Sequence, residues 1–122
     1  MTTLEIGKEG EEIALNYLKG KGYRILEQNW RFGNNNEVDI IALDRDYLVF
    51  VEVKSRKKGS LQTPVAAVDR NKQRILIRAA NAYISRYDMD YNARFDIIGI
   101  EFSREGHTLE HIDQAFYPTL RP

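Results

Sequence analysis

The sequence predicts an α/β or α+β fold, in which helices flank one central mixed β-sheet and the elements follow the order αβββαββ. Two observations predict this class. Segments with apolar residues at helical spacing stand before and between runs that are rich in β-branched and aromatic residues. The chain has 122 residues, 43% of them hydrophobic, which suits one core. We therefore expect a single domain over residues 1–122.

The first third of the chain predicts one helix, one strand and a loop. Residues 7–20 have an apolar face at helical spacing, and Gly20 and Gly22 mark the end of that helix. A strand is expected over residues 23–31, and residues 33–36 form a loop by their Gly and Asn content. The apolar face of the helix consists of Ile13, Ala14, Tyr17 and Leu18.

The middle of the chain predicts a β-hairpin. Residues 37–43 and 47–56 both read as strands, and only residues 44–46 separate them. If Asp44 and Tyr47 close a two-residue turn, facing residues have numbers that sum to 91. The two strands are therefore expected to pair in one defined register.

The remainder predicts a second helix and two closing strands. Residues 57–63 form a polar loop, and Pro64 is well placed to open a helix that runs to about residue 86. Residues 94–102 and 109–116 read as strands. The apolar side of the second helix consists of Val68, Ile75, Leu76, Ala79, Ala80, Tyr83 and Ile84.

Charge is segregated along the chain, although 18 basic and 18 acidic residues cancel. Residues 36–53 carry five acids and one base, and residues 54–78 carry eight bases and one acid. An acidic centre beside a basic flank suits a metal site next to a polyanion. Charge counts alone also fit an ordinary solvated surface, which is the simpler interpretation.

The predicted hairpin brings acidic side chains together on one face. With facing numbers that sum to 91, Asp39 lies opposite Glu52, and Glu37 lies opposite Lys54. Shifting the register by one residue would place Asp39 beside Val51 and bury a charge among valines. Because alternate residues of a strand point to opposite faces, this register predicts that all four polar side chains lie on one face of the hairpin.

Two facing carboxylates need a proton or a cation between them. At an effective dielectric near 20, unit charges about 4 Å apart repel by about 4 kcal/mol. The chain has no Cys and two His, so a hard cation with oxygen ligands, Mg²⁺ or Mn²⁺, fits better than zinc. The absence of Cys also excludes a disulfide scaffold, an iron–sulfur site and a thiol nucleophile. An ion pair between Glu37 and Lys54 is the alternative interpretation of the same residues.

At these residues the sequence resembles a known pattern. Asp39 followed by Glu52, Val53 and Lys54 is similar to the Asp…Glu-x-Lys signature of the restriction-endonuclease-like nuclease fold. Over residues 7–117 the chain resembles the YraN-like family. The members of that family are regarded as predicted endonucleases that are similar to archaeal Holliday-junction resolvases. The residues that carry the family resemblance are Gly7, Glu11, Ala14, Tyr17 and Leu18, then 22–26, 29–31, 37–42, 48–54, Arg56, Lys72, Gln73 and 94–96.

The resemblance implies a catalytic role for four positions of the hairpin. Asp39 and Glu52 would bind Mg²⁺ or Mn²⁺, with help from the backbone carbonyl of Val53. Lys54 would position or activate the attacking water and stabilise negative charge that develops on the phosphate.

The resemblance also implies roles outside the hairpin. Glu11 matches a helical acid that contributes to the site in related resolvases, and Gln73 matches a polar position on the second helix that faces the same pocket. Glu37 matches a recurrent acid of the family and receives no role. The chain departs from the pattern in two places: Val38 stands where the signature has proline, and Asn36 stands where the family has glycine.

The implied activity is hydrolysis of phosphodiester bonds in DNA, including branched or structured DNA as in Holliday-junction resolvases. No base-reading motif is evident, so we expect contacts to phosphates rather than to base edges. Cutting two opposed strands favours a homodimer. The candidate nucleic-acid-binding residues are Arg56, Lys57, Lys58, Arg70, Lys72, Arg74 and Arg78.

Two other functions remain open from the sequence. One is a non-catalytic nucleic-acid-binding or adaptor module that keeps the nuclease fold, and the other is a protein-binding domain that uses the Ala-rich second helix. We interpret Arg94 and Asp96, which share a strand face, as a structural pair. No apolar run approaches the length of a membrane span and the first residues lack a signal pattern, so we expect a cytoplasmic protein without a membrane partner.

Overall fold

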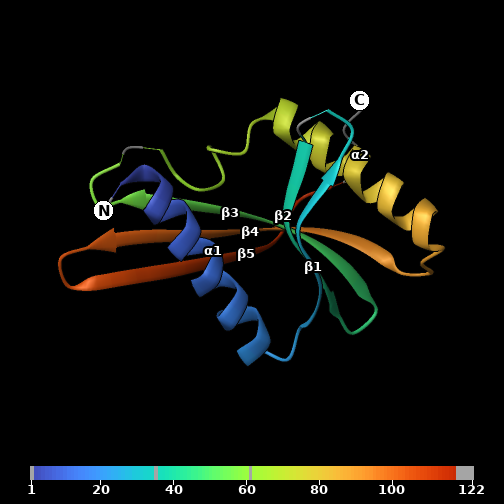
Figure 1. Cartoon of the computed structure of the whole chain (residues 1–122), viewed down its shortest axis with the longest axis horizontal. Helices are drawn as coiled ribbons and strands as arrows, with labels where there is room; N and C mark the ends of the chain where they lie inside the picture. Colours follow the sequence, from blue (N-terminus) through green and yellow to red (C-terminus); the bar gives the residue numbers. More distant parts are fainter. Residues whose placement is uncertain (1, 35, 61, 118–122) are drawn as a thin grey trace.

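A computed structural model of the chain describes residues 2–34, 36–60 and 62–117 (Figure 1). Asn35 and Leu61, which fall in predicted loops, lie outside the described residues, as do residue 1 and residues 118–122. The element order αβββαββ is confirmed. The elements are α1 (Thr3–Gly20), β1 (Arg24–Phe32), β2 (Asn36–Asp44), β3 (Tyr47–Lys57), α2 (Arg70–Tyr87), β4 (Asn92–Ser103) and β5 (Gly106–Phe116).

The strands form one five-stranded mixed sheet in the order β1-β2-β3-β4-β5. All neighbours are antiparallel except β3 and β4, which run parallel from Tyr47↔Asn92 to Lys57↔Phe102. A parallel pair needs a crossover connection, and α2 supplies it. The predicted mixed sheet with flanking helices is therefore confirmed.

Two apolar cores lie on opposite faces of this sheet, because successive strand residues point to opposite sides. On one face, Ala14 and Leu18 of α1 pack against Val49 and Val51 of β3. On the other face, α2 packs against Phe50 and its neighbours. Figure 1 shows the two helices on different sides of the sheet. The α2 residues of this second core are Leu76, Ile77, Ala79, Ala80 and Tyr83.

Helix α1 begins four residues before the predicted start because a capping box closes its first turn. The Thr2 backbone N–H donates to Glu5 Oε1 (3.0 Å), and the Glu5 N–H donates to Thr2 Oγ1 (3.1 Å). Its buried stripe includes Gly10, where an added Cβ would lie 1.7 Å from Ser55 Oγ. The missing side chain lets α1 approach β3 closely.

The prediction that Pro64 opens the second helix is wrong. The segment after it makes a separate turn, in which the Ala67 N–H donates to the Thr63 carbonyl (3.0 Å). Helix α2 begins only after Asp69, whose extended backbone and side chain, accepting from the Lys72 N–H at 2.9 Å, form the N-cap. Pro64 instead packs on β4, where a Cβ at Gly99 would lie 2.2 Å from Pro64 Cγ.

The predicted hairpin turn and its register are confirmed. Asp44 pairs with Tyr47, and the pairing continues to Ile40↔Val51 with residue numbers that sum to 91. Arg45 takes the left-handed backbone conformation (φ 55°) that such a tight turn requires. The first loop turns through Gly33 (φ 56°), and Asn36 is the first residue of β2.

Candidate active site

The candidate site lies where β2 separates from β3. Pairing between these strands is recorded from Asp44↔Tyr47 to Ile40↔Val51, and Asp39 stands directly beyond it. The Asp39 side chain takes over the bonding there, because its Oδ2 accepts the Val53 backbone N–H at 2.8 Å. The Asp39 carboxyl is therefore fixed beside the strand that carries Glu52.

Glu52 is the buried acid of the site, with 3% of its surface exposed. Its Oε2 lies 3.4 Å from Lys54 Nζ and 3.5 Å from Lys72 Nζ. Its Oε1 is buried and has no hydrogen-bond partner among the described residues. A buried carboxylate oxygen without a partner is costly, so this atom is available to a ligand that the polypeptide does not supply.

The alternative ion pair between Glu37 and Lys54 is not among the contacts of the described residues. Lys54 lies beside Glu52 on its own strand, and Glu37 instead lies 3.5 Å from Arg31 Nε on β1. The prediction that Lys54 lies opposite Glu37 is wrong, because the recorded pairing of β2 with β3 covers residues 40–44 of β2 and does not reach Glu37. Glu37 pairs instead with Arg31 of β1.

A cluster of three carboxylates stands at the same place. The cluster consists of Glu11 on α1 and of Glu37 and Asp39 on β2. Each residue contributes one carboxylate oxygen, and these three oxygens lie within 4.8 Å of one another. Asn29 of β1 joins two of them. With its amide oriented to satisfy both neighbours, Asn29 Nδ2 donates to Glu11 Oε1 (2.7 Å) and Glu37 Oε1 (2.9 Å). Two elements, α1 and β2, thus direct acidic oxygens to one point, and β1 supplies the amide that joins two of them.

The surroundings oppose negative charge on two of these acids. Burial raises the pKa of Asp39 to about 8, the charges of Glu52 and Glu11 add to the effect, and the Val53 N–H only partly offsets it. Burial, together with the charges of Glu37 and Glu52, also raises the pKa of Glu11. The cluster therefore favours protons or a cation.

One cleft of about 610 Å³ brings together most of the predicted catalytic residues. Its lining includes Glu11, Asp39, Glu52, Val53 and Lys54. This set comes from α1, β2 and β3, and we call the space the carboxylate cleft. Its lining continues along β3 and the following loop through Ser55, Arg56, Lys57 and Ser60, with Thr3, Ile6 and Gly7 contributed by the start of α1.

The structure does not bring Gln73 to the lining of the carboxylate cleft. Its side-chain Nε2 donates to the Val68 carbonyl (3.1 Å), and its backbone N–H donates to the Asp69 carbonyl (2.9 Å). Gln73 thus secures the turn that precedes α2 in this structure.

The predicted nucleic-acid-binding residues do not form one group. Lys57 lines the carboxylate cleft, and Lys58 follows it in the chain. Lys72 lies inside the site, at Glu52. Arg56 is held by Glu101, whose Oε2 lies 3.5 Å from Arg56 Nε, and it also donates to the Gln62 carbonyl. The remaining three lie on α2, with Arg70 and Arg78 exposed and Arg74 half-buried.

The sequence analysis assigns two residues beside the acids, Asn29 and Lys72, no role in metal binding or catalysis. Asn29 lies in the family-like segment 29–31, but nothing in the spacing indicates its left-handed backbone (φ 51°), which accompanies its position beside the acids. Lys72 belongs to the basic run that the sequence predicts to bind nucleic acid, not to the acids of the cleft. Its proximity to Glu52 depends on how α2 packs against the sheet, which local sequence does not reveal.

A second polar network ties together the elements around the site. Arg94 Nε and Nη2 donate to the two oxygens of Asp96 (2.9 Å each), so the predicted structural pair is present. His111 Nε2 lies 2.7 Å from Asp96 Oδ2, and His111 Nδ1 lies 3.0 Å from the Tyr17 hydroxyl of α1. Burial opposes the charge on Asp96, but the bonds from His111 and Arg94 hold its pKa below the usual range.

The chain is similar to proteins of one family. The model of the uncharacterised protein family UPF0102 matches residues 10–100. A UPF0102 protein of Chlorobium chlorochromatii is 44% identical, with 95% of this chain and 94% of the relative covered. Relatives from Phocaeicola vulgatus (43%; 95% and 95%) and Thermodesulfovibrio yellowstonii (43%; 96% and 100%) carry the same family description.

Neither helix of the described residues is long and apolar enough to cross a membrane.

Proposed function

The chain belongs to the uncharacterised protein family UPF0102, as its resemblance to the YraN-like family predicts, and we propose that it is a metal-dependent endonuclease that hydrolyses phosphodiester bonds of DNA. The family description assigns no activity, so the proposal depends on the site. The observation that carries it is the meeting of Asp39, Glu52 and Lys54 in one cleft. These residues match the Asp…Glu-x-Lys signature of restriction-endonuclease-like nucleases.

The donor set fits Mg²⁺ or Mn²⁺. Hard divalent cations prefer carboxylate and carbonyl oxygens, and the site offers Asp39, Glu52 and Glu11, with Val53 in the same cleft. Glu52 Oε1 has no partner among the described residues, and the Asp39 carboxyl is buried beside the charges of Glu52 and Glu11, so a cation at this point would stabilise both groups. We propose that these four residues hold the cation.

In hydrolysis, a water oxygen bonds to phosphorus while the bond from phosphorus to the leaving sugar oxygen breaks. Mg²⁺ or Mn²⁺, when bound, supplies Lewis-acid chemistry for that displacement. Lys54 lines the same cleft, with its ammonium 3.4 Å from Glu52 Oε2, where it can orient the water and stabilise charge on the phosphate. Lys72 Nζ lies 3.5 Å from the same Glu52 oxygen and supplies a second positive charge beside the carboxylate.

The substrate class in this proposal is DNA, including branched forms. The exposed bases Lys57, Lys58, Arg70 and Arg78 offer phosphate contacts, which give binding that is independent of base sequence and falls with salt. A junction-resolving activity would pair two copies, because two opposed strands must be cut.

Cleavage of labelled four-way junction, flap, duplex and single-stranded DNA tests the proposal. We expect cutting with Mg²⁺ or Mn²⁺, none with EDTA, and none by the Asp39→Ala and Glu52→Ala variants. Glu9→Ala removes the same charge from an exposed position of α1 and should cut like the wild type.

Two results would contradict the enzyme: no cutting by folded protein with added metal, or cutting that survives Asp39→Ala. DNA binding that weakens with salt but leads to no cutting would favour the adaptor module. Absence of any salt-dependent binding would leave the protein-binding domain.

A further inference from the structure

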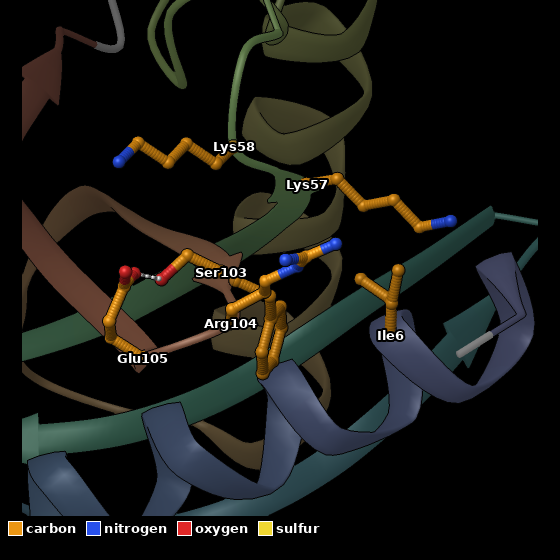
Figure 2. Close-up of a pocket in the computed structure, with 7 residues that line it drawn as sticks. Ile6, Lys57, Lys58, Ser103, Arg104 and Glu105 are labelled. Atoms are coloured by element: carbon orange, nitrogen blue, oxygen red, sulfur yellow. Dashed lines mark hydrogen bonds between the residues drawn. The ribbon is translucent and has the colours of Figure 1, made fainter.

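A second hollow, of about 720 Å³, opens beside the carboxylate cleft (Figure 2). It lies where the end of β3, the turn between β4 and β5, and the start of α1 meet. We call it the flanking groove, and its lining residues are Ile6, Lys57, Lys58, Phe102, Ser103, Arg104 and Glu105.

The flanking groove and the carboxylate cleft form one continuous surface, because Ile6 and Lys57 line both. The backbone fixes their relation. Lys57 pairs with Phe102 in the parallel ladder, and the Lys58 N–H donates to the Phe102 carbonyl (2.8 Å). A nucleic-acid strand bound in the carboxylate cleft at Lys54 can therefore continue into the flanking groove and stay in contact with the protein.

The flanking groove carries an excess of positive charge. Within the described residues, no carboxylate forms a salt bridge with the exposed side chains of Lys57, Lys58 or Arg104. The one acid in the lining, Glu105, accepts a bond from Ser103 Oγ (3.2 Å). Figure 2 shows Lys57 and Arg104 extending to the side where Ile6 lies, whereas Lys58 extends the other way and Glu105 meets Ser103.

We propose that the flanking groove binds backbone phosphates of the same nucleic-acid strand whose scissile phosphate lies in the carboxylate cleft. The identity of the ligand rests on the proposed function. Lys57 and Lys58 provide point charges, and Arg104 provides a planar fork that suits two phosphate oxygens. The other lining residues include Ile6 and Phe102, whose apolar side chains add no negative charge that would repel a phosphate.

Arg104 is the new member of the predicted interface. It stands in the turn between β4 and β5, and the basic segment singled out in the sequence ends at residue 78. The parallel pairing of β3 with β4 brings this distant turn to Lys57 and Lys58.

Binding of a labelled DNA duplex in EDTA tests the flanking groove apart from cleavage. Each DNA phosphate that the protein neutralises adds about 0.9 to the magnitude of the slope of log affinity against log salt. We expect Arg104→Ala and Lys58→Ala each to reduce that slope by about 0.9 and to weaken binding several-fold at low salt. Arg104→Lys should keep most of the slope, and Glu105→Gln should strengthen binding.

Arg45→Asn is the matched control. It removes one cation from the β2–β3 turn, which Figure 1 shows at the other end of the sheet, and Asn tolerates the left-handed backbone there. Its slope should equal that of the wild type. Circular dichroism and thermal melting confirm that each variant folds.

The outcomes separate the two proposals. A folded Arg104→Ala protein with unchanged affinity and slope, together with unchanged binding by Glu105→Gln, overturns the flanking groove even if the wild type cuts DNA. Binding that depends on Arg104, without any metal-dependent cutting, supports the groove and overturns the nuclease.

Discussion

Asp39 lies where burial and two acidic neighbours all oppose its ionisation. The same carboxyl accepts the Val53 N–H, so it cannot turn away from Glu52 without losing that bond. An acid held in this way binds either a proton or a cation, and the choice depends on pH and on metal concentration.

Asp39 should therefore make the free energy of unfolding depend on pH. The folded pKa of about 8 exceeds the unfolded value, so the folded chain binds the additional proton between about pH 4 and pH 8. Stability from this group is present at low pH and is lost as pH rises through that window. In EDTA, Asp39→Asn should flatten this part of the profile and melt several degrees above the wild type near pH 8.

Thermal melting from pH 5 to pH 9 checks this prediction. Added Mn²⁺ should raise the melting temperature of the wild type at pH 8 and leave Asp39→Asn unchanged. Equal pH profiles for the two proteins in EDTA would show that Asp39 ionises normally.

Lys72 offers a test of whether the two lysines beside Glu52 have separate roles. Both lysine ammoniums lie within 3.5 Å of the same carboxylate oxygen, but only Lys54 lines the carboxylate cleft. We expect Lys54→Ala to reduce single-turnover cleavage by about 10²–10³-fold, the range for loss of one group that stabilises the transition state.

Lys72→Ala should instead cause a smaller loss, because Lys72 does not line the carboxylate cleft and its ammonium acts only through the Glu52 carboxylate. Single-turnover rates with Mn²⁺ distinguish the two variants, with Arg86→Ala as an exposed control on α2. Equal losses for Lys54→Ala and Lys72→Ala would contradict separate roles.

At the scale of elements, the position of α1 decides the position of Glu11. The buried stripe of α1 repeats every four residues through Ile6, Gly10, Ala14 and Leu18. Glu11 follows the one glycine of this stripe, at the point where the helix comes closest to Ser55. The contact between Gly10 and Ser55 thus brings α1 close to β3, and the same approach brings Glu11 to the other acids.

Gly10→Ala should separate α1 from β3. The new Cβ would meet Ser55 Oγ at 1.7 Å and Ser55 Cβ at 2.9 Å, so the helix must shift. We expect a loss of about 1–3 kcal/mol in the free energy of unfolding, measured by urea denaturation, together with weaker metal binding.

Gly7→Ala is the matched control on the same helix, where an added Cβ has nothing within 4 Å. It should stabilise the protein by about 0.5–1 kcal/mol, because alanine restricts the unfolded chain. If both variants change stability alike, the close contact at Gly10 does not limit the packing of α1.

The sequence predicts some of these elements better than others. Strand parity suffices for the hairpin, because a shift of one residue would bury charge, and the register proves correct from Asp44 to Ile40. Parity cannot show where two strands separate, so the expected neighbour of Lys54 is wrong. Pro64 suits a helix start by local rules, but its contact with Gly99 is tertiary and no local pattern contains it.

At the scale of the whole molecule, the Arg94 network connects elements that are distant in the chain. Besides Asp96, Arg94 bonds to Asp44 at the hairpin turn (2.8 Å) and to the Tyr23 hydroxyl (2.6 Å). Through His111 and Tyr17 the same network reaches α1. Burial opposes the charge on Arg94, but the bonds to Asp96 and Asp44 outweigh it and raise its pKa.

Asp96→Asn should destabilise the fold strongly. It replaces one of the two carboxylates that face the buried Arg94 guanidinium by a neutral amide. Breaking a buried pair costs up to about 3–5 kcal/mol, and the remaining pair with Asp44 reduces the loss. Asp113→Asn makes the same chemical change at an exposed position of β5 and should stay within about 0.5 kcal/mol of the wild type. Chemical denaturation of both proteins measures the difference, and similar midpoints would show that the network contributes little.

The two edge strands share a feature with consequences for how copies of the chain meet. Each contains a residue with left-handed backbone, Asn29 in β1 and Gln114 in β5, and each has a register shift. Such irregularities interrupt the row of free N–H and C=O groups that would otherwise recruit another strand. We therefore expect this protein to resist edge-to-edge aggregation, and any dimer to form through helices or loops.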